Sequence, residues 1–144
     1  MDHIDDCISF LSGKAAQAVA RLTRERLSNH GVTPVQFAVL EVLWERDGQS
    51  AAEIGGRLVL DSATITGILD RIEKLGLIAR GADTDDRRVN RIMLTPAGRA
   101  RLASLQPVMD AINAEVAERL GADAPELWRL LRRLAAIPTA GKEP

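Results

Sequence analysis

Apolar residues recur every three or four positions over the first thirty residues, which is the period of an amphipathic helix. The pattern ends near residues 29–31, which are Asn-His-Gly and are typical of a helix C-terminus. The sequence therefore predicts a long first helix with one buried stripe. The residues of this stripe are Ile4, Ile8, Leu11, Ala15, Ala18, Val19 and Leu22.

A capping box predicts where the second helix begins. Residues 33–36 are Thr-Pro-Val-Gln, which places a hydroxyl at the N-cap, a proline in the first turn and a glutamine three residues after the cap. Residues 47–48, Asp-Gly, are expected to follow the end of this helix. The side chains expected to face a core are Phe37, Leu40, Leu43 and Trp44.

The next two helices are predicted to be short and separated by a tight turn. Residues 50–53, Ser-Ala-Ala-Glu, form a second capping box, and the helix runs through Ile54 and Leu58 although the Gly-Gly pair at 55–56 weakens it. The fourth helix is capped by Asp61 or Ser62 and ends at Gly76. Its predicted inward residues are Ile65, Ile68, Leu69, Ile72 and Leu75, and its outward residues are Thr64, Thr66, Gly67, Asp70, Arg71 and Lys74.

The pattern then changes to two short strands, residues 77–82 and 91–94, joined by a polar turn. Ile78, Ile92 and Leu94 are expected on the buried face of this hairpin. Two short helices, a tight turn and a hairpin indicate a winged helix-turn-helix. We therefore expect a mostly α (α+β) fold with a winged helix-turn-helix DNA-binding domain over residues 33–95.

Long helices flank this domain. Thr95-Pro96 is expected to cap a fifth helix with a kink at Pro107, and residues 123–126 a sixth. Their apolar stripes are Leu102, Leu105, Met109, Ile112, Val116 and Leu120, then Leu127, Leu130, Leu131, Leu134 and Ile137.

A winged-helix core of roughly 60 residues cannot cover so much apolar surface, so we expect residues 1–32 and 96–137 to form the dimerisation region of a twofold homodimer. The alternative is that the first, fifth and sixth helices pack within one chain. Residues 138–144 are expected to be a disordered tail.

Charge, cysteine and histidine content and the length of apolar runs limit the classes of function that the chain can have. The 144-residue chain has a net charge of −1, yet residues 57–101 hold nine Lys or Arg against six Asp or Glu, so basic charge gathers around the hairpin. One cysteine and two histidines give no zinc-ligand spacing, and we expect neither a metal nor a cofactor. No apolar run approaches the roughly 18 residues of a membrane span, so a cytoplasmic protein without a membrane partner is expected.

The fourth helix and the hairpin carry the candidate chemistry. Small hydroxylated side chains at the start of the helix are suited to contact base edges in a major groove. Arginines at the hairpin tip are suited to a narrow minor groove, where the electrostatic potential is most negative. Helix capping for Ser62 and Thr64, and a solvated charged turn for Arg87 and Arg88, are the structural alternatives. DNA binding is the leading hypothesis.

Five blocks of the sequence, in order and at matching separations, resemble the multiple-antibiotic-resistance regulator (MarR) family of winged helix-turn-helix transcription factors. The blocks are residues 33–40, 61–66, 69–78, 86–88 and 94–98. The resemblance covers about residues 5–137. It implies a homodimer that binds a pseudo-palindromic double-stranded DNA operator, usually as a repressor, and releases it when a small effector binds.

The resemblance also implies roles for individual residues. Ser62, Ala63, Thr64 and Thr66 would lie at the major groove, and Arg88 in the minor groove. Arg87 and Arg71 would contact phosphates, while Asp86 would hold the wing arginines in place. These roles agree with the chemistry of hydroxyl, methyl and guanidinium groups at DNA.

The sequence says less about the effector that would release the regulator from DNA. A ligand pocket would lie where the first, second and fifth helices meet the DNA-binding domain, with Arg21, His30, Phe37 and Trp44 as candidate effector-binding residues for an aromatic or phenolic acid. Structural roles for the same residues, in the core or at the surface, are the alternative.

Three other functions compete with a ligand-responsive regulator. Cys7 invites comparison with thiol-based redox-sensing members of the family, but the chain has no tyrosine partner for it and its neighbours Asp5 and Asp6 disfavour a thiolate. An enzyme is not expected, because no phosphate loop, metal cluster or paired nucleophile is evident. A winged-helix protein-interaction module without a DNA role is the better competitor.

Overall fold

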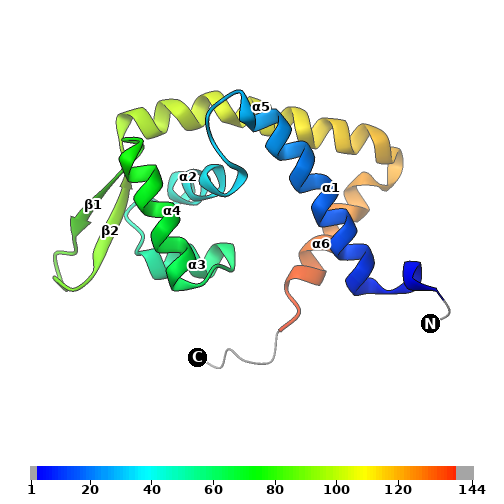
Figure 1. The fold of residues 1–144 in the computed structure, drawn as a ribbon, viewed down its shortest axis with the longest axis horizontal. Coiled ribbons are helices and arrows are strands. Elements are labelled where there is room, and N and C mark those ends of the chain that lie inside the picture. Colours follow the sequence, from blue (N-terminus) through cyan, green and yellow to red (C-terminus); the bar gives the residue numbers. More distant parts are fainter. Residues whose placement is uncertain (1–2, 139–144) are drawn as a thin grey trace. The chain divides into compact units, whose positions relative to one another are not determined.

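The computed structural model describes residues 3–138, and the chain divides into two compact units that meet within one helix, between Met109 and Asp110. The first unit contains, in order, the 3-10 helix η1 (Ile4–Asp6), α1 (Ile8–Ser28), α2 (Pro34–Glu45), α3 (Ala51–Leu58), α4 (Ser62–Lys74), β1 (Ile78–Ala82), β2 (Asn90–Leu94) and the first part of α5 (Pro96–Leu120) (Figure 1). The second contains the rest of α5, the 3-10 helix η2 (Gly121–Asp123) and α6 (Ala124–Ala135).

The predicted helix starts at α2 and α3 are confirmed. The Thr33 hydroxyl accepts from the Gln36 amide at 3.3 Å, and the Gln36 side chain accepts from the Thr33 amide at 3.0 Å. Ser50 and Glu53 form the same reciprocal pair at the start of α3. Each box satisfies two backbone donors that a helix end leaves unpaired, which is why both helices begin where the sequence places them.

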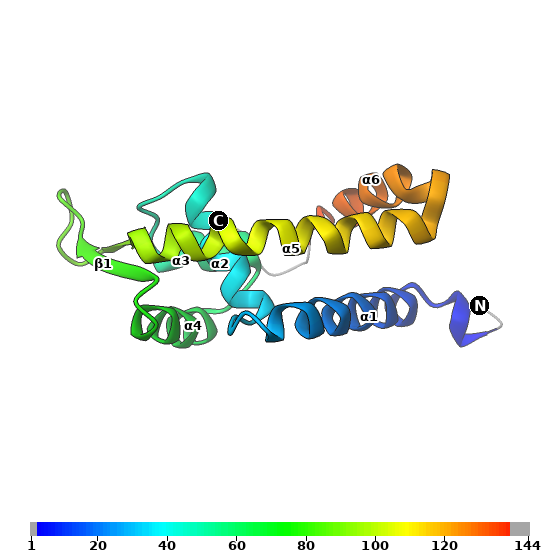
Figure 2. The ribbon, with the colours of Figure 1, turned by 90° about the horizontal axis from the view of Figure 1, so that it is seen from above.

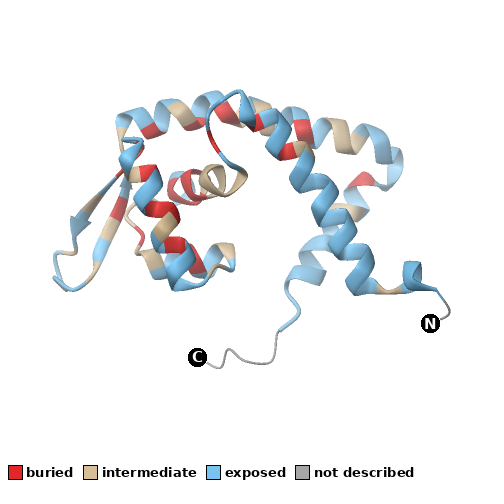
Figure 3. Ribbon diagram, in the orientation of Figure 1, coloured by how far each residue is buried: buried red, intermediate tan, exposed pale blue. Residues whose placement is uncertain are grey.

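The core of the first unit gathers side chains from α1, α3, the two strands and α5 around α2 and α4. Val39, Leu40 and Leu43 of α2 are fully buried, and the predicted inward residues of α4 from Ile65 to Ile72 are buried as well. Figure 3 shows these buried positions on the facing sides of the two helices. The core also contains Leu27, Val32, Ile78, Ile92, Leu94, Leu102 and Leu105.

This core shows how the flanking helices join the winged helix. The end of α1 and the start of α5 both contribute to it, so the winged helix of residues 33–95 shares its core with its flanks. The expected division into a DNA-binding domain and a dimerisation region of residues 1–32 and 96–137 stays a prediction.

Two expected core positions are wrong. Trp44 is half exposed, because Val42 and Leu43 already occupy the inner face of the last turn of α2 and Trp44 lies about 100° further round the helix. The Arg99 guanidinium lies over its ring, 5.8 Å from the centroid. Leu75 is also half exposed, because α4 ends at Lys74 and Leu77 fills the core in its place.

The wing, whose strand β1 is labelled in Figure 2, is a two-stranded antiparallel sheet of β1 and β2. In its register, Ile78 lies opposite Leu94 and Ala82 opposite Asn90. Ile78, Ile92 and Leu94 are buried as predicted. A backbone bridge ties the sheet to the segment before α3, since the Ile92 amide donates to the Gln49 carbonyl at 2.8 Å. We name residues 78–94 the wing and residues 83–89 the wing tip.

The stripe predicted on the first helix is exposed in the single chain. Ile8, Leu11 and Val19 of α1 are 64, 42 and 49% exposed. Ile4 belongs to η1, and of the stripe only Leu22 is partly buried in α1.

The stripe predicted on α6 is exposed in the single chain as well, at Leu130, Leu131, Leu134 and, just after the helix, Ile137. The cap predicted for α6 is absent as well. The 3-10 turn η2 gives Asp123 a helical backbone, and its side chain accepts no cap hydrogen bond. Helix α5 continues through Pro107.

The tail expected to be disordered lies outside the described residues, except for Pro138. Among the helices that the structure describes, none combines the length and apolarity needed to cross a bilayer.

Candidate nucleic-acid interface

The outer face of α4 carries small side chains at its N-terminal end. Ser62, Ala63, Thr64 and Thr66 are all exposed, whereas Ile65 between them is buried. The Asp61 carboxylate caps the helix by accepting from the Thr64 amide at 2.7 Å. This hydrogen bond is the main reason that the pKa of Asp61 lies below its usual value.

This cap decides between the two readings of the hydroxyls. Because Asp61 is the cap, the hydroxyls of Ser62 and Thr64 do not cap the helix. The Thr64 side chain hydrogen-bonds to the Asp61 carboxylate, and the Ser62 hydroxyl makes no hydrogen bond with another residue of 3–138. The Thr66 hydroxyl donates to the Ser62 carbonyl at 2.7 Å and keeps its acceptor lone pairs. The start of α4 therefore presents exposed hydroxyls and methyl groups to a partner.

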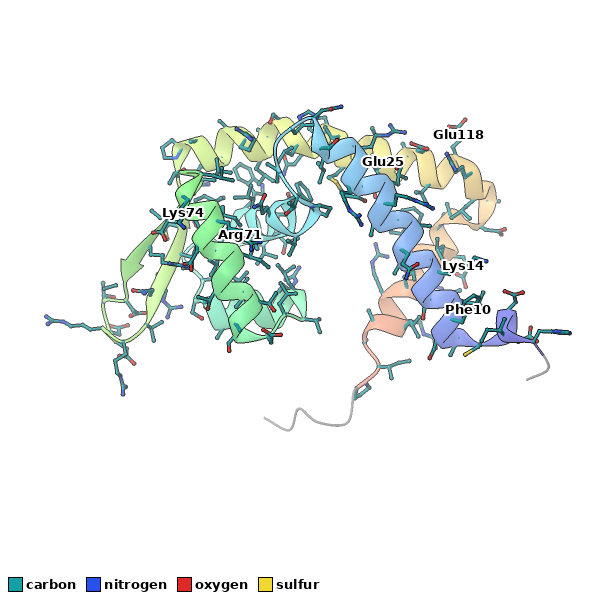
Figure 4. All side chains as sticks on the ribbon, viewed as in Figure 1. Phe10, Lys14, Glu25, Arg71, Lys74 and Glu118 are labelled. Carbon is teal, nitrogen blue, oxygen red and sulfur yellow. The ribbon has the colours of Figure 1, made fainter. Side chains whose placement is uncertain are left out.

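The C-terminal half of the same face is cationic. Figure 4 shows the long side chains of Arg71 and Lys74 projecting from α4 on the first unit. Neither makes a hydrogen bond or ion pair with another described residue. Cations without a carboxylate partner have their full charge available for phosphates.

The wing tip is organised by two aspartates. The Asp83 carboxylate accepts from the amides of Asp85 and Asp86 at 2.7 and 3.3 Å. The Asp86 carboxylate accepts from the Arg88 amide at 3.0 Å and from its guanidinium at 3.1 and 3.2 Å. These hydrogen bonds hold the pKa of both carboxyls below the usual range, with the Asp85 amide as the largest cause for Asp83 and the Arg88 side chain for Asp86.

The two tip arginines differ in their surroundings. The Arg88 side chain is 90% exposed although it pairs with Asp86. Arg87 is exposed and has no partner within residues 3–138. The tip therefore presents two guanidinium groups to solvent, one oriented by a carboxylate and one free.

Several charged residues that hold the wing to α3 and α4 were not found from the sequence. The Arg80 guanidinium on β1 lies 2.8 Å from Asp70 and 3.0 Å from Glu73 of α4. Arg91 on β2 bridges Asp83 and Glu53. Charge spacing cannot reveal such pairs, because their members come from different elements.

The four candidate effector residues have different surroundings in the described chain. Arg21 lines a groove on α1 with Lys14, Gln17, Ala18 and Arg24, and none of the other three lines that groove. The carbonyl of His30 accepts from Arg101 at 2.9 Å. Phe37 packs partly buried against the core.

Cys7 lies at the N-cap of α1 and is half-buried. No cap hydrogen bond involves its side chain. The structure gives this thiol no catalytic or redox partner within residues 3–138.

The interface described above falls in the segment that matches a known family. The MarR family model matches residues 32–89, which extend from the residue before the first capping box to the end of the wing tip. The HTH-type transcriptional regulator TtmR of Methylorubrum extorquens (strain PA1) is 39% identical over 134 residues, covering 93% of this chain and 67% of that protein. The chain belongs to the MarR family.

Solved MarR-like structures share the whole fold. The crystal structure of a probable transcriptional regulator from Pseudomonas aeruginosa has a TM-score of 0.84 and 38% identity, covering 92% of this chain and 99% of that one. The transcriptional repressor CouR, bound to a 23-mer DNA duplex, has a TM-score of 0.85 and 29% identity, covering 95 and 96% of the two chains. This MarR-family chain is a DNA-binding transcriptional regulator with a winged helix-turn-helix fold.

Proposed function

We propose that this MarR-family regulator binds a pseudo-palindromic operator as a homodimer, with α4 in the major groove and the wing tip in the neighbouring minor groove. The observation that carries the proposal is the placement of exposed polar groups. Exposed hydroxyls lie at the start of α4, and cations without carboxylate partners among the described residues lie at its end and at the wing tip.

On α4, we assign base contacts to Ser62, Ala63, Thr64 and Thr66. A hydroxyl can donate to or accept from any base edge, and the methyl groups of Ala and Thr suit the thymine methyl. Arg71 lies two turns further along the exposed face and is assigned to a phosphate.

At the wing, we assign the minor-groove contact to Arg88 and a phosphate contact to Arg87. Asp86 supports the assignment, because its carboxylate fixes the guanidinium of Arg88 at the tip instead of leaving a long side chain to sample many rotamers. Asp86 is therefore a support for the wing arginines and not a DNA contact.

A homodimer is proposed because apolar side chains remain exposed on both flanking segments. Ile8, Leu11 and Val19 are exposed on α1, and four large apolar residues are exposed on α6 and just after it. Large exposed apolar patches on a folded protein are typical of protein–protein interfaces. A second copy would cover them and place two copies of α4 for two half-sites.

For regulation, we propose that the chain represses transcription in the cytoplasm, without catalysis, and that a small effector such as an aromatic or phenolic acid relieves the repression. The support is family membership, and Arg21, His30, Phe37 and Trp44 remain candidate effector contacts. An effector bound between the flanking helices would change the separation of the two copies of α4 in the dimer. The effector would then bind the DNA-free state more tightly than the DNA-bound state, which release from DNA requires. A thermal-shift screen with aromatic acids tests this part.

The DNA contacts are tested with a duplex selected from a random library by the wild-type chain. Arg88→Ala is expected to weaken binding by about 1–3 kcal/mol and to lower the salt slope, because one guanidinium leaves the DNA. Thr64→Ala is expected mainly to relax the discrimination between the selected duplex and single-base variants. Fluorescence anisotropy titrations at several salt concentrations measure both effects.

Arg129→Ala is the matched control, since Arg129 pairs with Glu126 on α6 and lies outside the proposed DNA surface. It should leave both titrations unchanged. Equal affinities for wild type, Arg88→Ala and Thr64→Ala would favour a winged-helix protein-interaction module, which has no need of these groups.

A further inference from the structure

Arg91 connects two carboxylates that are far apart in the sequence. Its Nη1 lies 3.0 Å from Oε2 of Glu53, in the first turn of α3, and its Nε donates to Oδ2 of Asp83 at the wing tip. Glu53 and Arg91 are separated by 38 residues along the chain. One guanidinium thus links the wing tip with the helix-turn-helix.

The Glu53 end of this link is fixed to α3. Oε2 of Glu53 also accepts from the Ser50 amide at 2.8 Å, and Oε1 accepts from Arg46 at 3.2 Å. The Ser50 amide is the largest cause that lowers the pKa of Glu53, so the carboxylate is ionised at neutral pH. Arg91 therefore pairs with a side chain that its own helix start already holds in one rotamer.

The Asp83 end leads to the DNA-contacting arginine. Asp83 accepts from the Asp86 amide, and Asp86 accepts from the backbone and side chain of Arg88. A continuous series of hydrogen bonds and ion pairs thus runs from Glu53 through Arg91, Asp83 and Asp86 to Arg88.

The base of the wing has other attachments, but the tip relies on this series. At the base, the Gly48 amide donates to the Ile92 carbonyl at 3.0 Å and the Ile92 amide to Gln49. At the tip, the Asp83 and Val89 amides donate to Val89 and Asp86, which are bonds within the tip itself. Among the described contacts, the tip is joined to α3 through Arg91.

We propose that Arg91 is a positioning residue for DNA binding, which ties the wing tip to the capping box of α3 and so fixes the offset between Arg88 and the base-contacting face of α4. This inference rests on the proposed function. It implies that Glu53, an acidic residue, favours the binding of an anionic polymer.

The direction in which Glu53→Gln changes the affinity for DNA therefore tests the proposal. Simple electrostatics predicts that Glu53→Gln, which removes a negative charge near DNA, tightens binding or leaves it unchanged. A positioning role predicts the opposite. Glutamine retains the capping-box geometry, so α3 should keep its start.

Binding is measured by fluorescence anisotropy with the duplex selected by the wild-type chain. We expect Glu53→Gln to bind about two- to fivefold more weakly, which corresponds to the worth of an exposed ion pair. Arg91→Gln should bind more weakly still, Arg91→Lys should recover part of the loss, and the Glu53→Gln/Arg91→Gln double variant should equal Arg91→Gln. Arg129→Gln, which removes an ion pair on α6, should change nothing.

Amide hydrogen exchange without DNA provides the second measurement. Exchange at residues 83–91 should accelerate in Glu53→Gln and Arg91→Gln, while residues 39–43 in the core should keep their wild-type rates. Affinity equal to or higher than wild type for Glu53→Gln, or unchanged exchange at the wing tip, would overturn the inference. If the wild-type chain binds no duplex, the proposed function fails, and the exchange rates alone then decide whether Arg91 holds the wing tip.

Discussion

Val59 has a backbone conformation that β-branched residues rarely adopt. It lies in the turn between α3 and α4, with φ 56° and ψ 46°, and it is 85% exposed. In this left-handed region the Cβ atom crowds the neighbouring carbonyl, which costs about 1–2 kcal/mol in a residue other than glycine. The strain lies at the turn that sets the angle between the two helices of the DNA-binding motif.

Val59→Gly is therefore expected to raise the free energy of unfolding by about 0.5–1 kcal/mol. The relief of strain exceeds the entropy that glycine adds to the unfolded chain, and an exposed side chain gives up little burial. Urea unfolding at one fixed protein concentration measures it. Val59→Ala keeps a Cβ and should gain less; a loss of stability in Val59→Gly would refute the assignment of strain.

Gly98 is constrained by space instead of by its dihedral angles. A Cβ at this position would lie 2.0 Å from the Leu77 carbonyl oxygen, which accepts from the Thr95 amide at 3.1 Å. The start of α5 is thus in direct backbone contact with the start of the wing. A side chain here would push the two apart.

Gly98→Ala is expected to lower the free energy of unfolding by about 1–3 kcal/mol, the range for overpacking a close contact. The matched control is Gly56→Ala, where an added Cβ meets nothing within 4 Å and the helix α3 should gain about 1 kcal/mol. Thermal unfolding of both variants checks the pair. Equal shifts in the same direction would contradict the packing argument.

At the scale of single residues, the sequence predicts those features whose cause is local. The capping boxes of Thr33 and Ser50, the buried residues of α4 up to Ile72 and the exposed hydroxyls all follow from spacing along one element. Trp44 and Leu75 were misplaced because helix ends and competition from neighbouring side chains decide their burial. The links made by Arg80 and Arg91 depend on tertiary contacts that spacing does not contain.

At the scale of elements, the wing depends on ionised carboxylates. The pKa values of Asp83 and Asp86 are lowered in the folded chain, mainly by hydrogen bonds from the Asp85 amide and the Arg88 side chain respectively. A carboxyl whose folded pKa is lowered contributes stability above its unfolded pKa, about 4, and loses it as the pH falls through the folded value.

We therefore expect the stability difference between wild type and Asp83→Asn to be complete at pH 6 and to shrink steadily as the pH falls below about 4. Urea unfolding across this pH range measures the difference. Asp85→Asn serves as the control, since the Asp85 side chain makes no hydrogen bond or ion pair with another described residue. A difference that is independent of pH would show that Asp83 does not act through its charge.

Element boundaries were predicted well, whereas the sequence left open what covers the apolar faces of the flanking helices. The periodic stripes of α1 and α6 are real, but in one chain their apolar residues lie at the surface. Periodicity shows which face of a helix is apolar and does not show what covers it. A stripe on a flanking helix fits burial by a second copy as well as burial within the chain.

At the scale of the whole molecule, regulation requires that two DNA-binding surfaces act together. One copy presents one α4 and one wing, which can read half of a pseudo-palindrome. Two half-sites lie about 34–36 Å apart when their centres are one helical turn apart, so a twofold dimer must present its two α4 helices at that spacing. In the proposed regulator, the exposed apolar residues of α1 and α6 hold two copies together, and the exposed cations of each copy bind DNA.

The central claim is tested most directly by footprinting the wild-type chain on its selected duplex, with one reagent that reports guanine N7 in the major groove and one that reports the backbone and minor groove. We expect two major-groove protections related by a twofold axis, each flanked on its outer side by a minor-groove protection that Arg88→Ala removes. A single unsymmetrical footprint, or minor-groove protection unchanged in Arg88→Ala, would contradict the account.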